Sequence, residues 1–308
     1  MARGTMKCFH SQALPTLLQD ESSLPLWKGK ISCDMLLDEN IVTSAEIIDC
    51  QPLPSEVIRS AHSRAYLHKI LSGQMDLKEQ LLLGFKVTPA VYPLVSSSVN
   101  ASISTCLTAL AEKVAVSLSG GMHNAYEDFG LNYSIFNDVA ISAKILRQMY
   151  PQIKILIIDT DADHGAGTNS LLKDDPLTKT FSFHSYGSRK PSFMSDYDVT
   201  VARYIEGNSY IDLLMDRLAT ALERSMPDLV IWVSGVSGHY LDQSRLMRLN
   251  SEDLFYRDIL ISRAMIKNKI PLAVLLGGGN NENSVLTGKL HRNTIAAVKH
   301  NARAYASG

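Results

Sequence analysis

Three aspartates at alternate positions follow one apolar run of the sequence. Asp159, Asp161 and Asp163 come directly after residues 155–158, Ile-Leu-Ile-Ile, which have the composition of a buried strand. Side chains at every second position of an extended chain point to the same side. Catalytic carboxylates and metal ligands often collect at the carboxyl end of a parallel strand. The spacing therefore predicts a site for a metal ion or for acid–base chemistry.

The segments that must position these residues alternate between strands and helices. Apolar runs of strand length occur at 114–118, 153–158, 179–183, 229–233 and 271–276. Helical periodicity follows the start signal Asn137-Asp138, and it recurs over residues 211–222. Near-continuous apolar strands separated by helices predict an α/β fold of three layers, a parallel sheet with helices on both faces.

No repeat, low-complexity tract or long linker divides the 308 residues. A chain of this length with 45% hydrophobic residues can bury a large core. We therefore expect a single domain over residues 1–308. Residues 1–60 are rich in Leu, Pro and Ser, and we expect them to form an irregular N-terminal segment.

Charge and cysteine usage exclude several classes of protein. The formal net charge is −1, so no basic surface for nucleic acid is indicated. No apolar run approaches the roughly 20 residues of a membrane span, and the N-terminus lacks the apolar core of a secretory signal. The four cysteines form no CxxC pair, which argues against a cysteine zinc site or a disulfide framework. We expect a cytoplasmic protein without nucleic-acid or membrane partners.

Six short segments occur in an informative order: 61–67 (AHSRAYL), 120–125 (GGMHNA), 136–140 (FNDVA), 159–168 (DTDADHGAGT), 180–184 (TFSFH) and 277–280 (GGGN). They resemble the motifs vHspeYl, GGxHHA, xNDixxA, DxDvHxGxGT, tfSlH and GGGY of the arginase/deacetylase superfamily. The resemblance is nearest to class IV histone deacetylases and to bacterial deacetylases of the acetoin-utilisation type. It extends from about residue 25 to residue 300 and implies the same α/β fold.

The zinc ligands of that family are altered in this sequence. Active members hold zinc with two aspartates and one histidine, and Asp161 matches the first aspartate. The histidine position holds Asp163, and the second aspartate position, after strand 229–233, holds Ser237. Because a serine hydroxyl is a poor zinc ligand, the resemblance implies that zinc is absent. An alternative alignment, shifted by five residues, would let Asp242 supply the third ligand.

The groups that would perform amide hydrolysis are altered as well. The family's likely general base, the second of two tandem histidines, is replaced by Asn124, and the residue that supports it by Ala166. An amide has no basic nitrogen and cannot take a proton from water. The tyrosine that polarises the substrate carbonyl is replaced by Asn280. The resemblance therefore implies that the usual deacetylase mechanism is lost.

Some of the family's machinery is kept. His123 and Asp159 match the remaining histidine–aspartate pair, which could act as an acid or a base, or could be a buried structural pair. Asp159, Asp161 and Ser182 match the buried site for a structural monovalent cation, K⁺ or Na⁺. Such an ion neutralises carboxylates that would be costly to bury alone.

The kept aspartate Asp161 and the altered position Asp163 have two interpretations. Asp161 and Asp163 could serve the monovalent ion or face a wet pocket. They could also form a remodelled divalent site, because His239 lies two residues beyond Ser237 and would point to the same side of an extended loop. Oxygen ligands alone favour magnesium or manganese, whereas a histidine ligand would make zinc suitable.

Two functions remain open at the sequence level. The first is a pseudo-deacetylase that binds a small-molecule or acylated ligand, or a protein partner, in the old pocket. The second is a hydrolase or lyase that acts on an acyl, amide or guanidino substrate through the remodelled metal site or the His123–Asp159 pair. Tyr133 would contribute either to the aromatic pocket wall or to the core. Asn280 would contribute either to a polar pocket rim or to a turn.

Overall fold

The computed structural model describes residues 6–11, 27–187 and 193–306. Eight parallel strands form one sheet in the order β2-β1-β3-β8-β7-β4-β5-β6. The strands are β1 (Lys7–His10), β2 (Ile47–Asp49), β3 (Val114–Ser117), β4 (Ile155–Asp159), β5 (Thr178–Ser185), β6 (Tyr197–Val201), β7 (Leu229–Val233) and β8 (Leu272–Leu275). The described helices are α1 (Trp27–Asp38), α2 (Ser55–Ile58), α3 (Arg64–Ser72), α4 (Leu77–Leu83), α5 (Val91–Glu112), α6 (Asp138–Met149), α7 (Ala166–Leu172), α8 (Gly207–Ser225), α9 (Ser251–Lys267) and α10 (Ser284–Ala306).

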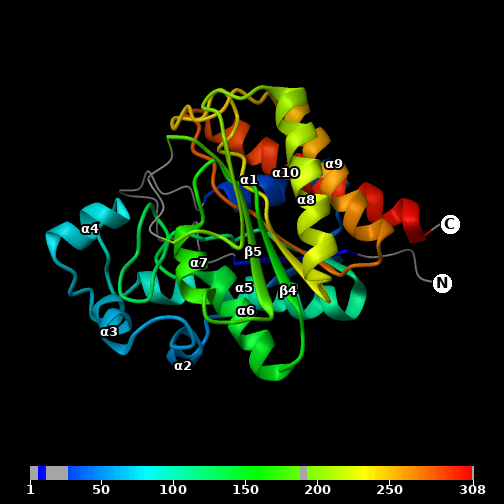
Figure 1. The fold of residues 1–308 in the computed structure, drawn as a ribbon. Helices are drawn as coiled ribbons and strands as arrows, with labels where there is room; N and C mark the ends of the chain where they lie inside the picture. Colours follow the sequence, from blue (N-terminus) through cyan, green and yellow to red (C-terminus); the bar gives the residue numbers. More distant parts are fainter. Residues whose placement is uncertain (1–5, 12–26, 188–192, 307–308) are drawn as a thin grey trace.

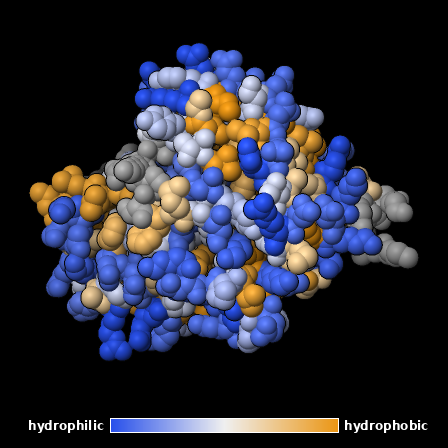
Figure 2. Space-filling model, in the orientation of Figure 1, coloured by the Kyte–Doolittle hydropathy of each residue, from blue (hydrophilic) through white to orange (hydrophobic). Residues whose placement is uncertain are grey.

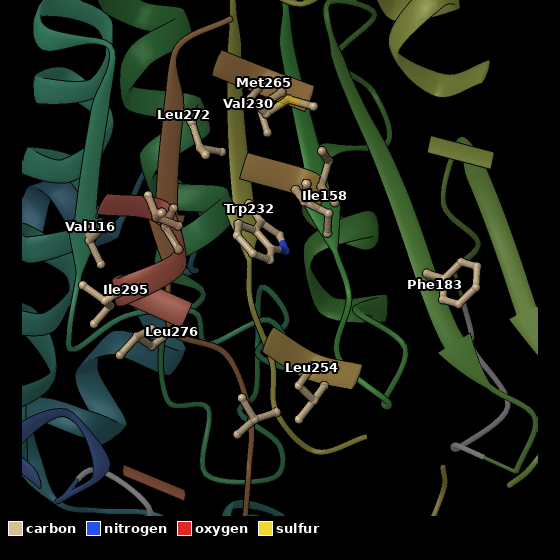
Figure 3. Packing of buried hydrophobic residues seen from close by; sticks show 14 of the residues in the cluster. Val116, Ile158, Phe183, Val230, Trp232, Leu254, Met265, Leu272, Leu276 and Ile295 are labelled. Atoms are coloured by element: carbon tan, nitrogen blue, oxygen red, sulfur yellow. The ribbon is translucent and has the colours of Figure 1, made fainter. Parts of the chain in front are cut away.

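Helices cover both faces of this sheet (Figure 1). Along β4, Leu156 and Ile158 belong to a core cluster shared with α1, α8, α9 and α10, whereas Ile155 and Ile157 belong to a second cluster shared with α5 and α6. This alternation follows from the period of two in a strand. Figure 3 shows the first cluster around the fully buried Trp232. The predicted three-layer α/β fold is confirmed.

The five predicted strands are present within one or two residues of the expected bounds. Both predicted helices are present as well, but α8 begins four residues before and ends three residues after the predicted range 211–222. The strand signals were strong because each strand is buried on both faces and so has an almost unbroken apolar sequence. Helix α6 begins at the expected signal, since the Asn137 side chain accepts a hydrogen bond from the Ala140 N–H.

The expectation of an irregular segment over residues 1–60 is corrected in the described part of that range. It contains β1, β2, α1 and α2, and β1 pairs with both β2 and β3 within the sheet. β1 has four residues and β2 has three, which is too short for a period of two to stand out in the sequence. Their pairing is therefore set by tertiary contacts and not by local propensity.

Helix α5 is long and apolar enough, by length and composition, to cross a membrane. Its most apolar 18-residue window is 61% buried inside the protein, and the helix packs on α6 and β3. This is the behaviour of a core helix in a layered α/β domain.

A buried ion pair joins the N-terminal segment to the last helix. The Lys299 ammonium on α10 donates to both carboxylate oxygens of Glu46, at 2.6 and 2.7 Å. Glu46 also accepts the Met6 N–H, which precedes β1. The side chains of the pair are only 3% and 7% exposed. Loss of the ammonium alone would leave a buried, uncompensated carboxylate.

We predict that Lys299→Met lowers the free energy of unfolding by about 3–5 kcal/mol, the usual result of breaking a buried pair on one side. Lys7→Met is the matched control, because the Lys7–Glu112 pair is more than a third exposed and such pairs contribute about 1 kcal/mol or less. Urea denaturation followed by circular dichroism measures both variants. Equal losses in the two variants would contradict the structural role given to Glu46.

Candidate functional site

A cavity of about 190 Å³ opens at the carboxyl edge of the sheet. The segments that follow β3, β4, β7 and β8 form its wall, and these four strands are neighbours in the sheet. This is the position at which parallel α/β sheets usually bind ligands. The cavity brings together seven of the residues that the sequence indicated: His123, Asn124, Tyr133, Asp161, Asp163, Ser237 and Asn280.

The start of α6 holds the segment after β3 in place. Asn137, the N-cap residue, donates from its amide to the carbonyl of His123 at 3.2 Å. The next residue, Asp138, is buried, and its carboxylate accepts the N–H groups of Gly121 (2.8 Å) and Met122 (2.6 Å). These bonds fix the backbone that presents the His123 ring to the cavity.

His123 forms a buried pair with the last residue of β4. Its Nδ1 lies 2.5 Å from Oδ2 of Asp159, and both side chains are about 5% exposed. Burial opposes the charged imidazolium, but attraction to Asp159 and the hydrogen bond outweigh it, so the pKa of His123 rises from 6.5 to about 9. At neutral pH this ring can donate a proton, but it has no free basic nitrogen.

The Asp161 carboxylate is enclosed by protein donors. Its Oδ1 accepts the Ser237 hydroxyl at 2.5 Å and the Asp163 N–H at 3.1 Å, and its Oδ2 accepts the Gly278 N–H at 2.8 Å. The backbone also approaches closely, since a Cβ added at Gly235 would stand 2.0 Å from Oδ2. Three of about four lone-pair positions on this carboxylate are therefore occupied.

The zinc site implied by the resemblance does not fit these residues. Ser237 lies where the second aspartate is expected, and its hydroxyl is used as a donor to Asp161 rather than as a ligand. Asp242, the alternative ligand, lines the same cavity but accepts the N–H groups of Asn280 and Ser244 at 2.6 and 3.0 Å. The geometry thus agrees with the first alignment, in which Ser237 replaces the ligand.

His239 is placed away from the two aspartates. Its Nε2 lies 3.3 Å from the Ser251 hydroxyl, and its Nδ1 accepts the Leu241 N–H, also at 3.3 Å. A turn causes this, because the N–H of His239 bonds back to the carbonyl of Val236. The segment is therefore not extended, and Ser237 and His239 do not share a side. In the part of the chain that the structure describes, the one group of three convergent metal-ligating side chains lies elsewhere.

Of two further charged residues in the cavity, Lys28 was missed and Asp242 was named only through the alternative alignment. Lys28, on α1, is buried and donates its ammonium to the carbonyl of Gly277, and burial lowers its pKa from 10.5 to about 8. Burial likewise raises the pKa of Asp242 from 3.8 to about 6. Asp242 had a signal in the alternative alignment. Lys28 had none, because it lies in a stretch without a recognisable motif.

Aromatic and amide groups complete the wall. The Tyr133 ring stacks on Phe85 with an interplanar angle of 7°, and it faces the cavity as well as packing against its neighbour. The Asn280 side-chain amide lies 3.5 Å from the Gln243 carbonyl oxygen, and this contact is exposed to solvent. Asn124 is buried beside His123. These amides can donate or accept hydrogen bonds but cannot activate water.

The residues indicated for a monovalent cation lie at neighbouring strand ends. Asp159 on β4 and Ser182 on β5 are paired in the register of the sheet, and Asp161 follows β4 directly. The Ser182 hydroxyl lies 3.4 Å from Nδ1 of His184. The side-chain donors of this set are all oxygen atoms, which suits a hard cation.

Comparison with known proteins agrees with the motif order. A profile of the histone deacetylase domain matches residues 27–294. An uncharacterised protein of Picosynechococcus sp. is 27% identical over 271 residues, which cover 87% of this chain and 90% of that protein. The acetoin utilization protein AcuC of Staphylococcus aureus (strain MSSA476) is 22% identical over 301 residues, covering 89% and 76%. AcuC of Staphylococcus xylosus is 26% identical over 175 residues, covering 53% and 45%. The resemblance drawn from the six motifs is confirmed.

We predict that the His123 ring titrates near pH 9 in ¹H–¹⁵N NMR spectra of the imidazole groups. Asp159→Asn removes the nearest attracting charge, while burial still opposes the imidazolium, so the pKa of His123 should fall from its wild-type value. Because the folded pKa is raised, the pair stabilises the fold fully below about pH 6.5 and loses this effect as the pH rises through about 9. A wild-type midpoint at or below 6.5 would contradict the buried ion pair.

Proposed function

The chain belongs to the histone deacetylase domain family, and from this premise we propose that it keeps the fold and pocket of the family without zinc-dependent amide hydrolysis. In this proposal the pocket binds a small polar ligand or a protein partner. The observation that carries the proposal is the 2.5 Å hydrogen bond from Ser237 to Asp161. It replaces a metal–ligand contact with a contact inside the protein.

The altered residues compensate one another. A lone buried carboxylate at position 161 would be costly, by several kcal/mol. The Ser237 hydroxyl and the Gly278 N–H donate hydrogen bonds to the charged form, which stabilises the buried carboxylate without zinc. A fold with these bonds has no need of zinc for its stability.

The remaining groups also support a binding role. Asn124 stands beside His123 where a base would be needed, and Asn280 stands at the exposed end where the family has its tyrosine. His123 is positively charged at neutral pH. The cavity therefore holds proton donors and hydrogen-bonding amides, and the neutral imidazole that serves as the family's base is missing from it.

The size and charge of the cavity define the ligand class. A volume of about 190 Å³ is smaller than the roughly 300–1,000 Å³ of pockets for drug-sized ligands. Asp163 and Asp242 face the space together with Lys28 and His123, so charges of both signs line the wall. Such a cavity suits a small molecule, or the end of a longer one, that both donates and accepts hydrogen bonds.

A reused enzyme is the second candidate function. His123 and Asp159 are kept and the ring faces the cavity, so this pair could act as a general acid on an acyl, amide or guanidino substrate. The Asp161 carboxylate is enclosed by protein donors, and the His239 ring lies outside the cavity. Both observations argue against a remodelled divalent site. The pseudo-deacetylase therefore accounts for more of the geometry.

Two further assignments belong to the proposal. We place the protein in a reducing, cytoplasmic compartment, because all four cysteines are buried and free.

We also propose that Asp159, Asp161 and Ser182 hold a structural K⁺ or Na⁺ ion. The paired positions of Asp159 and Ser182 support this, since the ion would neutralise charge at the ends of β4 and β5.

The cation proposal predicts that K⁺ raises the thermal midpoint more than tetramethylammonium does at equal ionic strength, because K⁺ binds only the folded state. Ser182→Ala should shrink that difference. Ser234→Ala is the control, because Ser234 follows β7 directly and its buried hydroxyl bonds to the carbonyl of Leu275 on β8. An identical response to both salts in the wild type would contradict the site.

The pseudoenzyme proposal predicts no release of acetate from acetyl-lysine peptides or acetylated polyamines, even with added zinc. Restoring the ligands with Asp163→His and Ser237→Asp should add about one equivalent of zinc per chain, measured by inductively coupled plasma mass spectrometry. Without zinc this variant should melt at a lower temperature, because two carboxylates then face each other.

Asp163→Asn with Ser237→Ala is the matched control, because it changes the same positions without supplying ligands. It should bind no more zinc than the wild type. Chelator-sensitive acetate release by the unaltered protein would overturn the proposal. Failure of the restored variant to gain zinc would show that the site has diverged beyond these two positions.

A further inference from the structure

We propose that His164, His184 and Asp198 form a transition-metal site, suited to zinc, that is separate from the cavity. One ligand atom from each of the three side chains lies within 4.8 Å of the others. The three side chains are only 2%, 2% and 11% exposed. The proposal does not depend on the loss of deacetylase activity, because none of these residues lines the cavity.

The sheet register brings two of the ligands together. β5 and β6 pair so that Ser182 lies opposite Asp198 and His184 lies opposite Thr200. Residues at alternate positions share a face, so His184 and Asp198 lie diagonally across one face of the two strands. His164 reaches the same place from the segment after β4. The site thus joins the segment after β4 to the strands β5 and β6.

The distances suit one shared ion. Nε2 of His164 lies 2.7 Å from Oδ2 of Asp198, and Nε2 of His184 lies 3.8 Å from Oδ1. Ligand atoms on a tetrahedral zinc, with bonds of about 2.0–2.2 Å, stand roughly 3.3 Å apart. The two observed separations fall on either side of that value. Small side-chain rotations would therefore be enough to admit the metal.

The donor chemistry favours a borderline metal over a hard one. Two imidazoles and a carboxylate are typical of zinc and neighbouring divalent metals, whereas magnesium and calcium select oxygen ligands. The Thr200 hydroxyl, 3.1 Å from Nε2 of His184, marks where a fourth ligand or a water molecule would lie. This separates the site from the oxygen-only cation site at Asp159.

Neighbouring groups orient the ligands as they do around known metal sites. The Ser195 hydroxyl and N–H donate to Oδ2 of Asp198 at 2.9 and 3.2 Å. On His184, Nδ1 lies 3.4 Å from the Ser182 hydroxyl, which leaves Nε2 toward Asp198. A carboxylate held by donors and an imidazole held through its far nitrogen are the arrangement that presents both to an ion.

His164 is free to adjust. Its Nδ1 is buried without a hydrogen-bond partner in the described part of the chain, so the ring is held through one nitrogen only. Rotation of the ring to bring Nε2 onto an ion would break no hydrogen bond at Nδ1. A metal ion provides a reason for a second imidazole, His184, to pack edge-on against the first at 4.4 Å between ring centroids.

The proposed metal site would hold in place the segment that forms one wall of the cavity. His164 directly follows Asp163, and Asp161 lies three residues earlier. A metal bound to His164, His184 and Asp198 would tie this segment to β5 and β6. The loop that carries Asp161 and Asp163 would then be held in place without a divalent ion in the cavity itself.

The test is titration of the metal-free, full-length protein with zinc and, separately, with Co²⁺. We expect about one zinc per chain from competition with a chromophoric chelator, and the visible absorption of tetrahedral Co²⁺. Asp198→Asn and His184→Gln should each weaken zinc binding by more than about tenfold, since even loss of a supporting contact costs roughly 10–100-fold. Circular dichroism checks that the variants fold.

Two controls locate the ion. Asp196→Asn alters a nearby half-exposed aspartate that pairs with Lys179, and it should bind zinc as the wild type does. Asp161→Asn alters the cavity and should also leave binding unchanged. Zinc binding that survives Asp198→Asn and His184→Gln but fails in Asp161→Asn would overturn both this site and the proposed function. Absence of zinc and Co²⁺ binding to the wild type would overturn this site alone.

Discussion

A buried carboxylate must be neutralised or surrounded by hydrogen-bond donors, and Asp161 is the carboxylate on which this site depends. It lies just beyond β4, among loops from four neighbouring strands, and it is only 2% exposed. The Ser237 hydroxyl and two backbone N–H groups supply its donors. The close approach of Gly235 and Gly278 follows from the same requirement, since a side chain at either position would collide with the carboxylate.

The rest of the cavity is arranged around this charge. His123 is held as an imidazolium by Asp159, and Lys28 reaches the carbonyl of Gly277 from α1. Together they oppose the charges of Asp163 and Asp242. The exterior shown in Figure 2 is mainly hydrophilic, with apolar residues gathered in smaller patches. A cavity lined by charges of both signs is suited to bind a ligand that carries polar groups.

Sequence reasoning was strongest where local patterns carried the information. Buried parallel strands have unbroken apolar runs, and motifs placed after β3, β4, β7 and β8 had to converge because these strands end at one edge. It was weaker where tertiary contacts decided. The short strands β1 and β2 form only through pairing. The turn at Val236 that redirects His239 could not be read from its residues. Asp198 meets His184 through strand register, which no local spacing encodes.

The central claim is that Asp161 is bonded within the protein and binds no divalent metal. Anomalous diffraction at the zinc absorption edge, from crystals grown with excess zinc, tests this most directly because it locates each ion. The account predicts no anomalous peak within coordination distance of Asp161 and a Ser237 hydroxyl still in contact with its carboxylate. A peak bound to Asp161, with Asp163 or Asp242 as a further ligand, would contradict the account and restore a metal-dependent enzyme.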